Sequence, residues 1–104
     1  MYKITPLRYF LEFSYKGTAY HGWQRQPNAS TVQQQMEDAL STLLGKETAV
    51  LAAGRTDTGV HAKQMFAHVD LALNAEAIKQ LGHRLNKFLP HDIAIKAIHP
   101  VKAD

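Results

Sequence analysis

Two stretches of the chain alternate apolar and polar residues with the period of a β-strand. Residues 7–16 place apolar side chains at every second position: Leu7, Tyr9, Leu11, Phe13 and Tyr15. Residues 64–71 repeat this alternation with Met65, Ala67, Val69 and Leu71. Such alternation is typical of strands that bury one face. Residues 47–53 and 92–99 are short and largely apolar, and they predict two further strands.

A longer segment after residue 30 has the spacing of an amphipathic helix. Either Ser30 with Gln33 or Thr31 with Gln34 forms a capping box at its start. Gly45 has the character of a C-terminal stop. The apolar positions between these ends are Val32, Met36, Leu40, Leu43 and Leu44.

A second helix is predicted from residue 74 to Pro90. Asn74 is suited to the N-cap, and Glu76 suits the positive end of the helix dipole. Gly82 lies inside this helix, where glycine costs about 1 kcal/mol relative to alanine. The apolar face consists of Ile78, Leu81, Leu85 and Phe88.

The predicted order is β-α-β-β-α-β, which defines an α+β fold of the ferredoxin-like or RRM-like kind. In this fold a four-stranded antiparallel sheet carries both helices on one face, and the other face stays uncovered. A length of 104 residues fits one domain, so we expect residues 1–104 to form a single unit.

Composition excludes several classes of protein. The absence of cysteine excludes disulfides and thiolate metal sites and favours an intracellular setting. No apolar run has the length of a membrane span, and the N-terminus lacks the apolar segment of a signal peptide. The net charge of +3 and pI near 9.3 permit a nucleic-acid partner without demanding one.

Residues 52–62, "AAGRTDTGVHA", which we call the aspartate loop, crowd functional groups between glycines. Taken alone, the spacing favours a simple turn, because Asp-Thr-Gly is good turn chemistry. A phosphate-binding loop would need Lys and Ser or Thr after Gly59, and Val60 follows instead. Arg55 and Asp57 exceed what a turn requires, and His61 could orient a neighbour or contact phosphate.

Residues 17–28, "GTAYHGWQRQPN", which we call the aromatic loop, form a second irregular stretch. Trp23 in such a segment commonly fills the edge of a core. The alternative is a polar and aromatic surface where Gln24 and Arg25 contact phosphate or a base edge. Both loops would form one site if they lie at the same end of the sheet. The six histidines are scattered without metal-ligand spacing, so we predict no metal site.

Three segments together resemble a known family. "GRTDTGVHA" is similar to the catalytic motif of the TruA family of tRNA pseudouridine synthases, "SYKGTAYHGWQRQ" to its N-terminal signature, and "RLNKFLPHDIAI" to its segment after the second helix. The resemblance runs from about residue 9 to about residue 98. Lys16 stands where the family commonly has aspartate, which is a tolerable change in a turn.

This resemblance implies an isomerase without a cofactor that detaches uracil from its ribose and reattaches it through C5. Asp57 corresponds to the essential carboxylate, which either attacks the uridine or takes a proton from the sugar. Arg55 corresponds to the arginine that fills the vacated space, and it should keep Asp57 ionised. The residues that we expect to contact RNA are Arg55, Gln24, Arg25, Thr58 and His61.

The resemblance implies that the partner is the anticodon stem and loop of tRNA, recognised by its shape. It also implies that the enzyme is a homodimer in the cytoplasm and does not bind a membrane. Family members are about twice as long, and their second half supplies a tyrosine and a basic residue to the site. We therefore expect residues 1–104 to be the N-terminal domain that carries Asp57, inactive alone.

Two other functions stay open. The chain could be a non-catalytic RRM-like RNA-binding module, although "KQMFAHVDL" lacks the glycine-aromatic pattern of such sheets. It could also be a plain ferredoxin-like domain that binds a metabolite or another protein.

Overall fold

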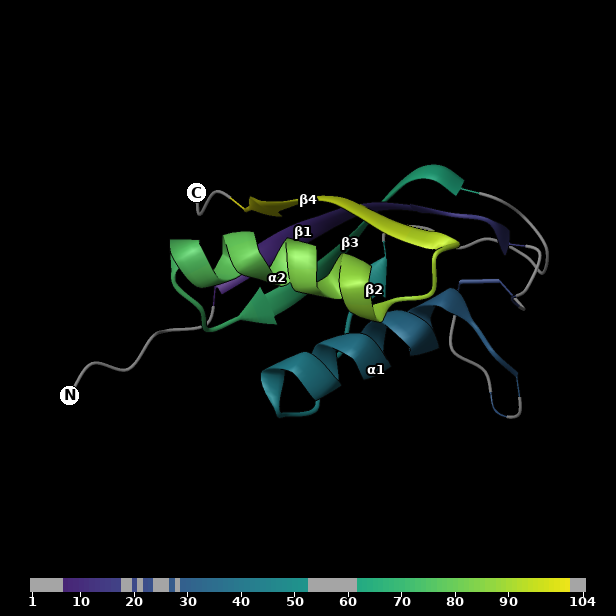
Figure 1. The fold of residues 1–104 in the computed structure, drawn as a ribbon, viewed down its shortest axis with the longest axis horizontal. Coiled ribbons are helices and arrows are strands. Elements are labelled where there is room, and N and C mark those ends of the chain that lie inside the picture. Colours follow the sequence, from purple (N-terminus) through teal and green to yellow (C-terminus); the bar gives the residue numbers. More distant parts are fainter. Residues whose placement is uncertain are drawn as a thin grey trace.

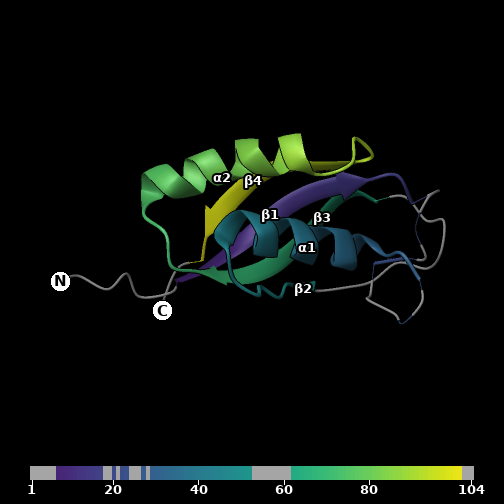
Figure 2. The same cartoon turned by 60° about the horizontal axis from the view of Figure 1, so that its bottom comes forward.

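The computed structural model describes residues 7–17, 20, 22–23, 27, 29–52 and 62–101. Within these residues the element order is β1 (Leu7–Tyr15), α1 (Val32–Leu44), β2 (Leu51–Ala52), β3 (Ala62–Leu71), α2 (Ala75–Phe88) and β4 (Ile93–Pro100). The strands form one sheet in the order β2-β3-β1-β4, with every neighbouring pair antiparallel. Both helices lie on the same face of this sheet (Figures 1 and 2). The predicted ferredoxin-like α+β fold is confirmed.

The core lies between the sheet and the helices. Alternation along β1 turns Leu11 and Phe13 inward, and neither side chain is exposed to solvent. Leu7, at the start of the same alternating set, is 57% exposed and lies outside this core. The helices contribute further buried side chains, chiefly Met36, Leu40, Leu81 and Leu85. Burying side chains of this size stabilises the fold by about 1.5–3 kcal/mol each.

Both helix starts use the predicted kind of cap. The hydroxyl of Thr31 accepts a hydrogen bond from the N–H of Gln34 at 3.2 Å, so Thr31, rather than Ser30, caps α1. Asn74 caps α2 by accepting from the N–H of Ala77 at 2.8 Å. Helix α1 ends at Gly45, whose φ of 72° is in the left-handed region that favours glycine.

The strand predicted over residues 47–53 is wrong for residues 47–50. Only Leu51–Ala52 pair with β3 as strand β2, and residue 53 lies outside the described residues. The backbone before Leu51 bonds instead to side chains of α1. The hydroxyl of Ser41 accepts from the N–H of Thr48 at 2.9 Å, and the carboxylate of Glu37 accepts from the N–H of Val50 at 2.9 Å.

Strand β4 lies at one edge of the sheet, where a side chain of α2 replaces a missing neighbour strand. The Asn86 amide donates to the carbonyl of Ile95 at 2.9 Å and accepts from the N–H of the same residue at 2.7 Å. The backbone polar groups of Ile95, a residue only 7% exposed, are therefore both satisfied.

The Asn86→Ala variant should lower the free energy of unfolding by about 1–3 kcal/mol, because it removes two hydrogen bonds to a buried backbone position. Chemical denaturation measures this change. Gln80→Ala, on the exposed side of the same helix, is the control and should change stability by less than about 0.5 kcal/mol. Equal losses in both variants would contradict the role given to Asn86.

Candidate functional site

One end of the sheet collects the anchors of both loops singled out in the sequence. Tyr15, the last residue of β1, pairs with Ala62 at the start of β3 and with Ile93 at the start of β4. Strand β2 is antiparallel to β3 and ends at Ala52. The chain therefore leaves β1 toward the aromatic loop at the same end where it leaves β2 for the aspartate loop. The directions of β1 and β2 thus agree with the condition under which both loops would form one site.

The centre of the aromatic loop is fixed by a buried tryptophan. Trp23 is 3% exposed, and its ring centroid lies 5.2 Å from that of Phe13 on β1. The carbonyls of Gly22 and Trp23 accept from the N–H groups of Val32 and Gln33 at 3.2 and 2.9 Å. The expected role of Trp23 as a residue that fills the edge of the core is confirmed.

The start of the aromatic loop is tied to the turn before β4. The hydroxyl of Tyr20 donates to Oδ1 of Asp92 at 2.6 Å, and the N–H of Lys16 donates to the Asp92 carbonyl at 2.9 Å. Burial raises the pKa of the Tyr20 hydroxyl, and the bond to Asp92 raises it further, so this group stays a donor. Sequence analysis missed this contact, which joins two of the three resemblance segments across 72 positions.

The approach to the aspartate loop is fixed by helix α1. The side-chain amide of Gln33 donates to the carbonyl of Val50 at 3.0 Å, while Glu37 accepts from the Val50 N–H. Gln33 also donates to Glu37 at 3.4 Å, so the two side chains support each other. Val50 is fully buried, and only two residues separate it from the first residue of the aspartate loop that the structure leaves undescribed. Helix α1 thereby holds the strand that leads into this loop.

The predicted site residues themselves lie outside the described residues. These are Asp57, Arg55, Gln24, Arg25, Thr58 and His61. What the structure gives is the rigid frame on both sides of them: the ends of β1 and β2, the starts of β3 and β4, Trp23 and Tyr20. Among the described residues no group of three or more His, Asp or Glu side chains could hold a metal ion.

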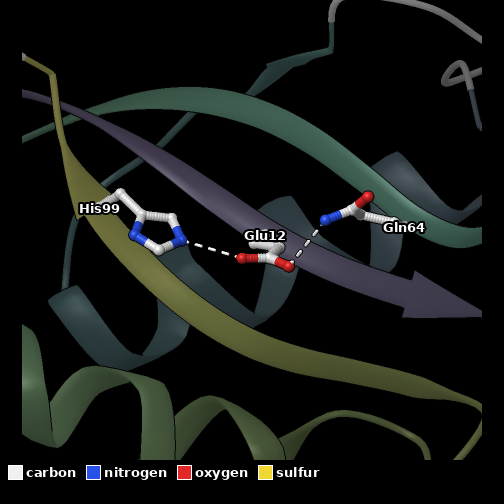
Figure 3. A network of polar contacts seen from close by, with 3 residues as sticks. All are labelled: Glu12, Gln64 and His99. Atoms are coloured by element: carbon white, nitrogen blue, oxygen red, sulfur yellow. Dashed lines mark hydrogen bonds and ion pairs between the residues drawn. The ribbon is translucent and has the colours of Figure 1, made fainter.

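The sheet face without helices carries a polar network that the sequence did not reveal. Glu12 accepts from the Gln64 amide at 3.0 Å and lies 2.9 Å from Nε2 of His99 (Figure 3). These hydrogen bonds, first that of His99 and then that of Gln64, lower the pKa of Glu12 from its ordinary value of 4.5. Phe10 and Phe66, each 39% exposed, lie on the same face. This face therefore combines charge, hydrogen-bonding groups and exposed aromatic rings.

Comparison with known proteins assigns this α+β domain to a class of tRNA-modifying proteins. The family model described as tRNA pseudouridine synthase matches residues 13–103. The chain belongs to this family.

Bacterial relatives share most of the chain. It is 52% identical over 98 residues to tRNA pseudouridine synthase A of Porphyromonas gingivalis, covering 93% of this chain and 39% of the relative. It is 45% identical over 97 residues to the protein of the same name from Bacteroides fragilis, covering 93% and 38%. Identity to tRNA pseudouridine synthase A 1 of Protochlamydia amoebophila is 50% over 94 residues, covering 89% and 36%. The chain thus spans well under half the length of these relatives.

Tyr20→Phe should lower the free energy of unfolding by about 1.5–3 kcal/mol, because it removes a hydrogen bond to a carboxylate. Chemical denaturation measures the loss. Tyr9→Phe is the matched control, since the ring of Tyr9 is buried in the core and its hydroxyl makes no hydrogen bond to the described part of the chain. A loss no larger than that of Tyr9→Phe would show that the Tyr20–Asp92 bond does not stabilise the fold.

Glu12 should titrate below its ordinary value of 4.5 in the folded protein, and His99→Ala should raise its pKa. Because the folded-state pKa is the lower one, Glu12 stabilises the fold above the unfolded-state pKa. This stabilisation is lost as the pH falls through the folded-state value. Carboxyl chemical shifts followed by NMR measure both effects. Arg8→Ala, on the same strand, is the control and should leave the titration of Glu12 in place.

Proposed function

We propose that the intact protein converts uridine to pseudouridine in the anticodon stem and loop of tRNA, with this chain supplying the essential carboxylate, Asp57. The observation that carries the proposal is the family match over residues 13–103, which includes both the aspartate loop and the aromatic loop. The common anchoring of both loops at one end of the sheet supports it, because a catalytic loop acts best from a rigid scaffold.

In the proposed reaction Asp57 acts on the ribose of a uridine that has left its stack. It either attacks the uridine or removes a proton from the sugar, while the bond between N1 of uracil and C1′ breaks. The freed uracil turns and bonds through C5, whose proton a base then removes. Arg55 occupies the space that the uridine leaves, and its charge keeps Asp57 ionised.

The remaining predicted residues would hold the RNA. Gln24 and Arg25 directly follow Trp23 in the sequence, and the Trp23 ring is buried. Thr58 and His61 flank Asp57 from the C-terminal side of the aspartate loop. Amide, guanidinium, hydroxyl and imidazole groups are suited to phosphate and sugar contacts that position a nucleic acid.

The proposal extends to the whole protein. We expect residues 1–104 to act as a domain that needs a second half for activity, in a homodimer located in the cytoplasm where tRNA is modified. Neither helix in the described part of the chain is long and apolar enough to cross a membrane.

Asp57→Asn in the intact protein should reduce the release of tritium from tRNA carrying 5-tritiated uridine by about 10⁴-fold or more, as expected for loss of an indispensable catalytic group. Asp70→Asn is the matched control, because Asp70 lies at the far end of β3 in an exposed ion pair with Arg8. Such an exposed pair is screened by solvent and contributes little to stability, so activity should be unchanged. Turnover by Asp57→Asn close to that of the control would refute the assignment.

A second function has one observation in its favour: Phe10 and Phe66 expose their rings on the uncovered sheet face, on the two central strands. Exposed aromatic residues on such strands stack unpaired bases in RRM domains. Under this alternative, Phe10→Ala and Phe66→Ala would weaken binding of single-stranded RNA more than Arg55→Ala does. The isomerase proposal predicts the opposite order for tRNA.

A further inference from the structure

A hollow of about 370 Å³ lies between helix α2 and the edge strand β4, along the outer side of the sheet. Its apolar lining includes Ile78, Gly82 and Ile98, and its polar lining includes Lys79 and His83 from the helix and Lys96 from the strand. The lysines and the histidine are exposed. This α2–β4 hollow runs along β4 and is separate from the loop anchors, which lie where β4 begins.

Gly82 leaves space in this hollow, although the fold does not require glycine at this position. It is not among the described glycines with positive φ, and a Cβ added there would contact only Cδ1 of Ile98, at an ordinary 3.9 Å. Glycine inside a helix nevertheless costs stability relative to alanine. Neither backbone conformation nor packing requires glycine at position 82, and the absence of a side chain leaves room for a close approach to the helix.

The charges around the hollow indicate which kind of partner would bind there. Of the seven lysine and arginine side chains that the structure describes, four belong to α2 and β4: Lys79, Arg84, Lys87 and Lys96. Glu76 is the acidic residue of α2, and it accepts a hydrogen bond from Gln80. A basic rim above an apolar floor matches a sugar–phosphate backbone, whose phosphates pair with cations and whose riboses present apolar faces.

We propose that the α2–β4 hollow binds the sugar–phosphate backbone of RNA, away from the uridine that reacts. Lys79 and Lys96 contact phosphates from opposite sides, and the absent side chain of Gly82 lets a ribose approach the helix. The proposal rests on the proposed function only in taking tRNA as the RNA. A contact here extends the footprint of the protein along the outer edge of the sheet.

The test measures tRNA binding to the intact protein by filter binding between about 50 and 200 mM salt. Lys79→Ala and Lys96→Ala should each weaken binding and reduce the slope of log affinity against log salt by about 1. Lys46→Ala, which removes an exposed charge in the turn after α1, is the matched control and should leave the slope unchanged. Slopes like that of the unmodified protein in both hollow variants would overturn the proposal.

Substitution of Gly82 separates stability from binding. Gly82→Ala should raise the midpoint of thermal unfolding, because alanine is the better helix former and 3.9 Å is an ordinary contact distance. Gly82→Leu should fill the hollow and weaken tRNA binding several-fold. Unchanged affinity in a folded Gly82→Leu protein would count against the proposal, and the lysine variants test it even if leucine prevents folding.

The outcomes distinguish this inference from the proposed function. If the unmodified protein binds tRNA through these lysines but releases no tritium, the isomerase proposal fails and RNA binding by the hollow is supported. If it releases tritium and its affinity for tRNA does not depend on either lysine, the isomerase proposal holds and RNA binding by the hollow is refuted. If Lys79→Ala changes the sedimentation mass of the protein and not its affinity for tRNA, the hollow contacts protein and the inference is wrong.

Discussion

The packing of Trp23 against Phe13 is the interaction on which the candidate site depends. Phe13 lies on β1, which pairs with β3 on one side and with β4 on the other, so its ring is held by the whole sheet. Trp23 lies outside any helix or strand, and an irregular segment has no ladder of hydrogen bonds to fix it. Burial of the indole supplies that fixed point, because a large ring in a close-packed interior has few alternative positions. This packing fixes Trp23, in the middle of the aromatic loop, against the central strand β1.

Local pattern was sufficient for most of the fold. The period of 2 located β1 and β3, and the caps Thr31, Asn74 and Gly45 defined helix ends because capping depends on neighbours in sequence. Residues 47–50 were predicted wrongly for the opposite reason. Their backbone partners are Ser41 and the pair Gln33 and Glu37, polar side chains on a helix whose orientation no local pattern specifies.

The residues of the candidate site were predicted by another kind of argument than the fold. Resemblance, rather than periodicity, singled out Asp57 and Arg55, since spacing alone favoured a turn. Two long-range contacts of the structure could not be obtained from either periodicity or resemblance: Tyr20 and Asp92 are 72 positions apart, and Glu12 and His99 are 87 apart. Such pairs follow from strand order and register, which the alternation of single strands does not determine.

The amide of Asn86 has a consequence for the behaviour of the protein in concentrated solution. An edge strand with open N–H and C=O groups is a template on which a strand of another molecule can add, and sheets that grow in this way lead to aggregates. At Ile95 both groups are already engaged by Asn86, along the edge of β4 that no strand covers within the described sheet. One polar side chain on a neighbouring helix thus opposes the addition of a strand from another molecule at this point, and β4 does not need to be shorter for that purpose.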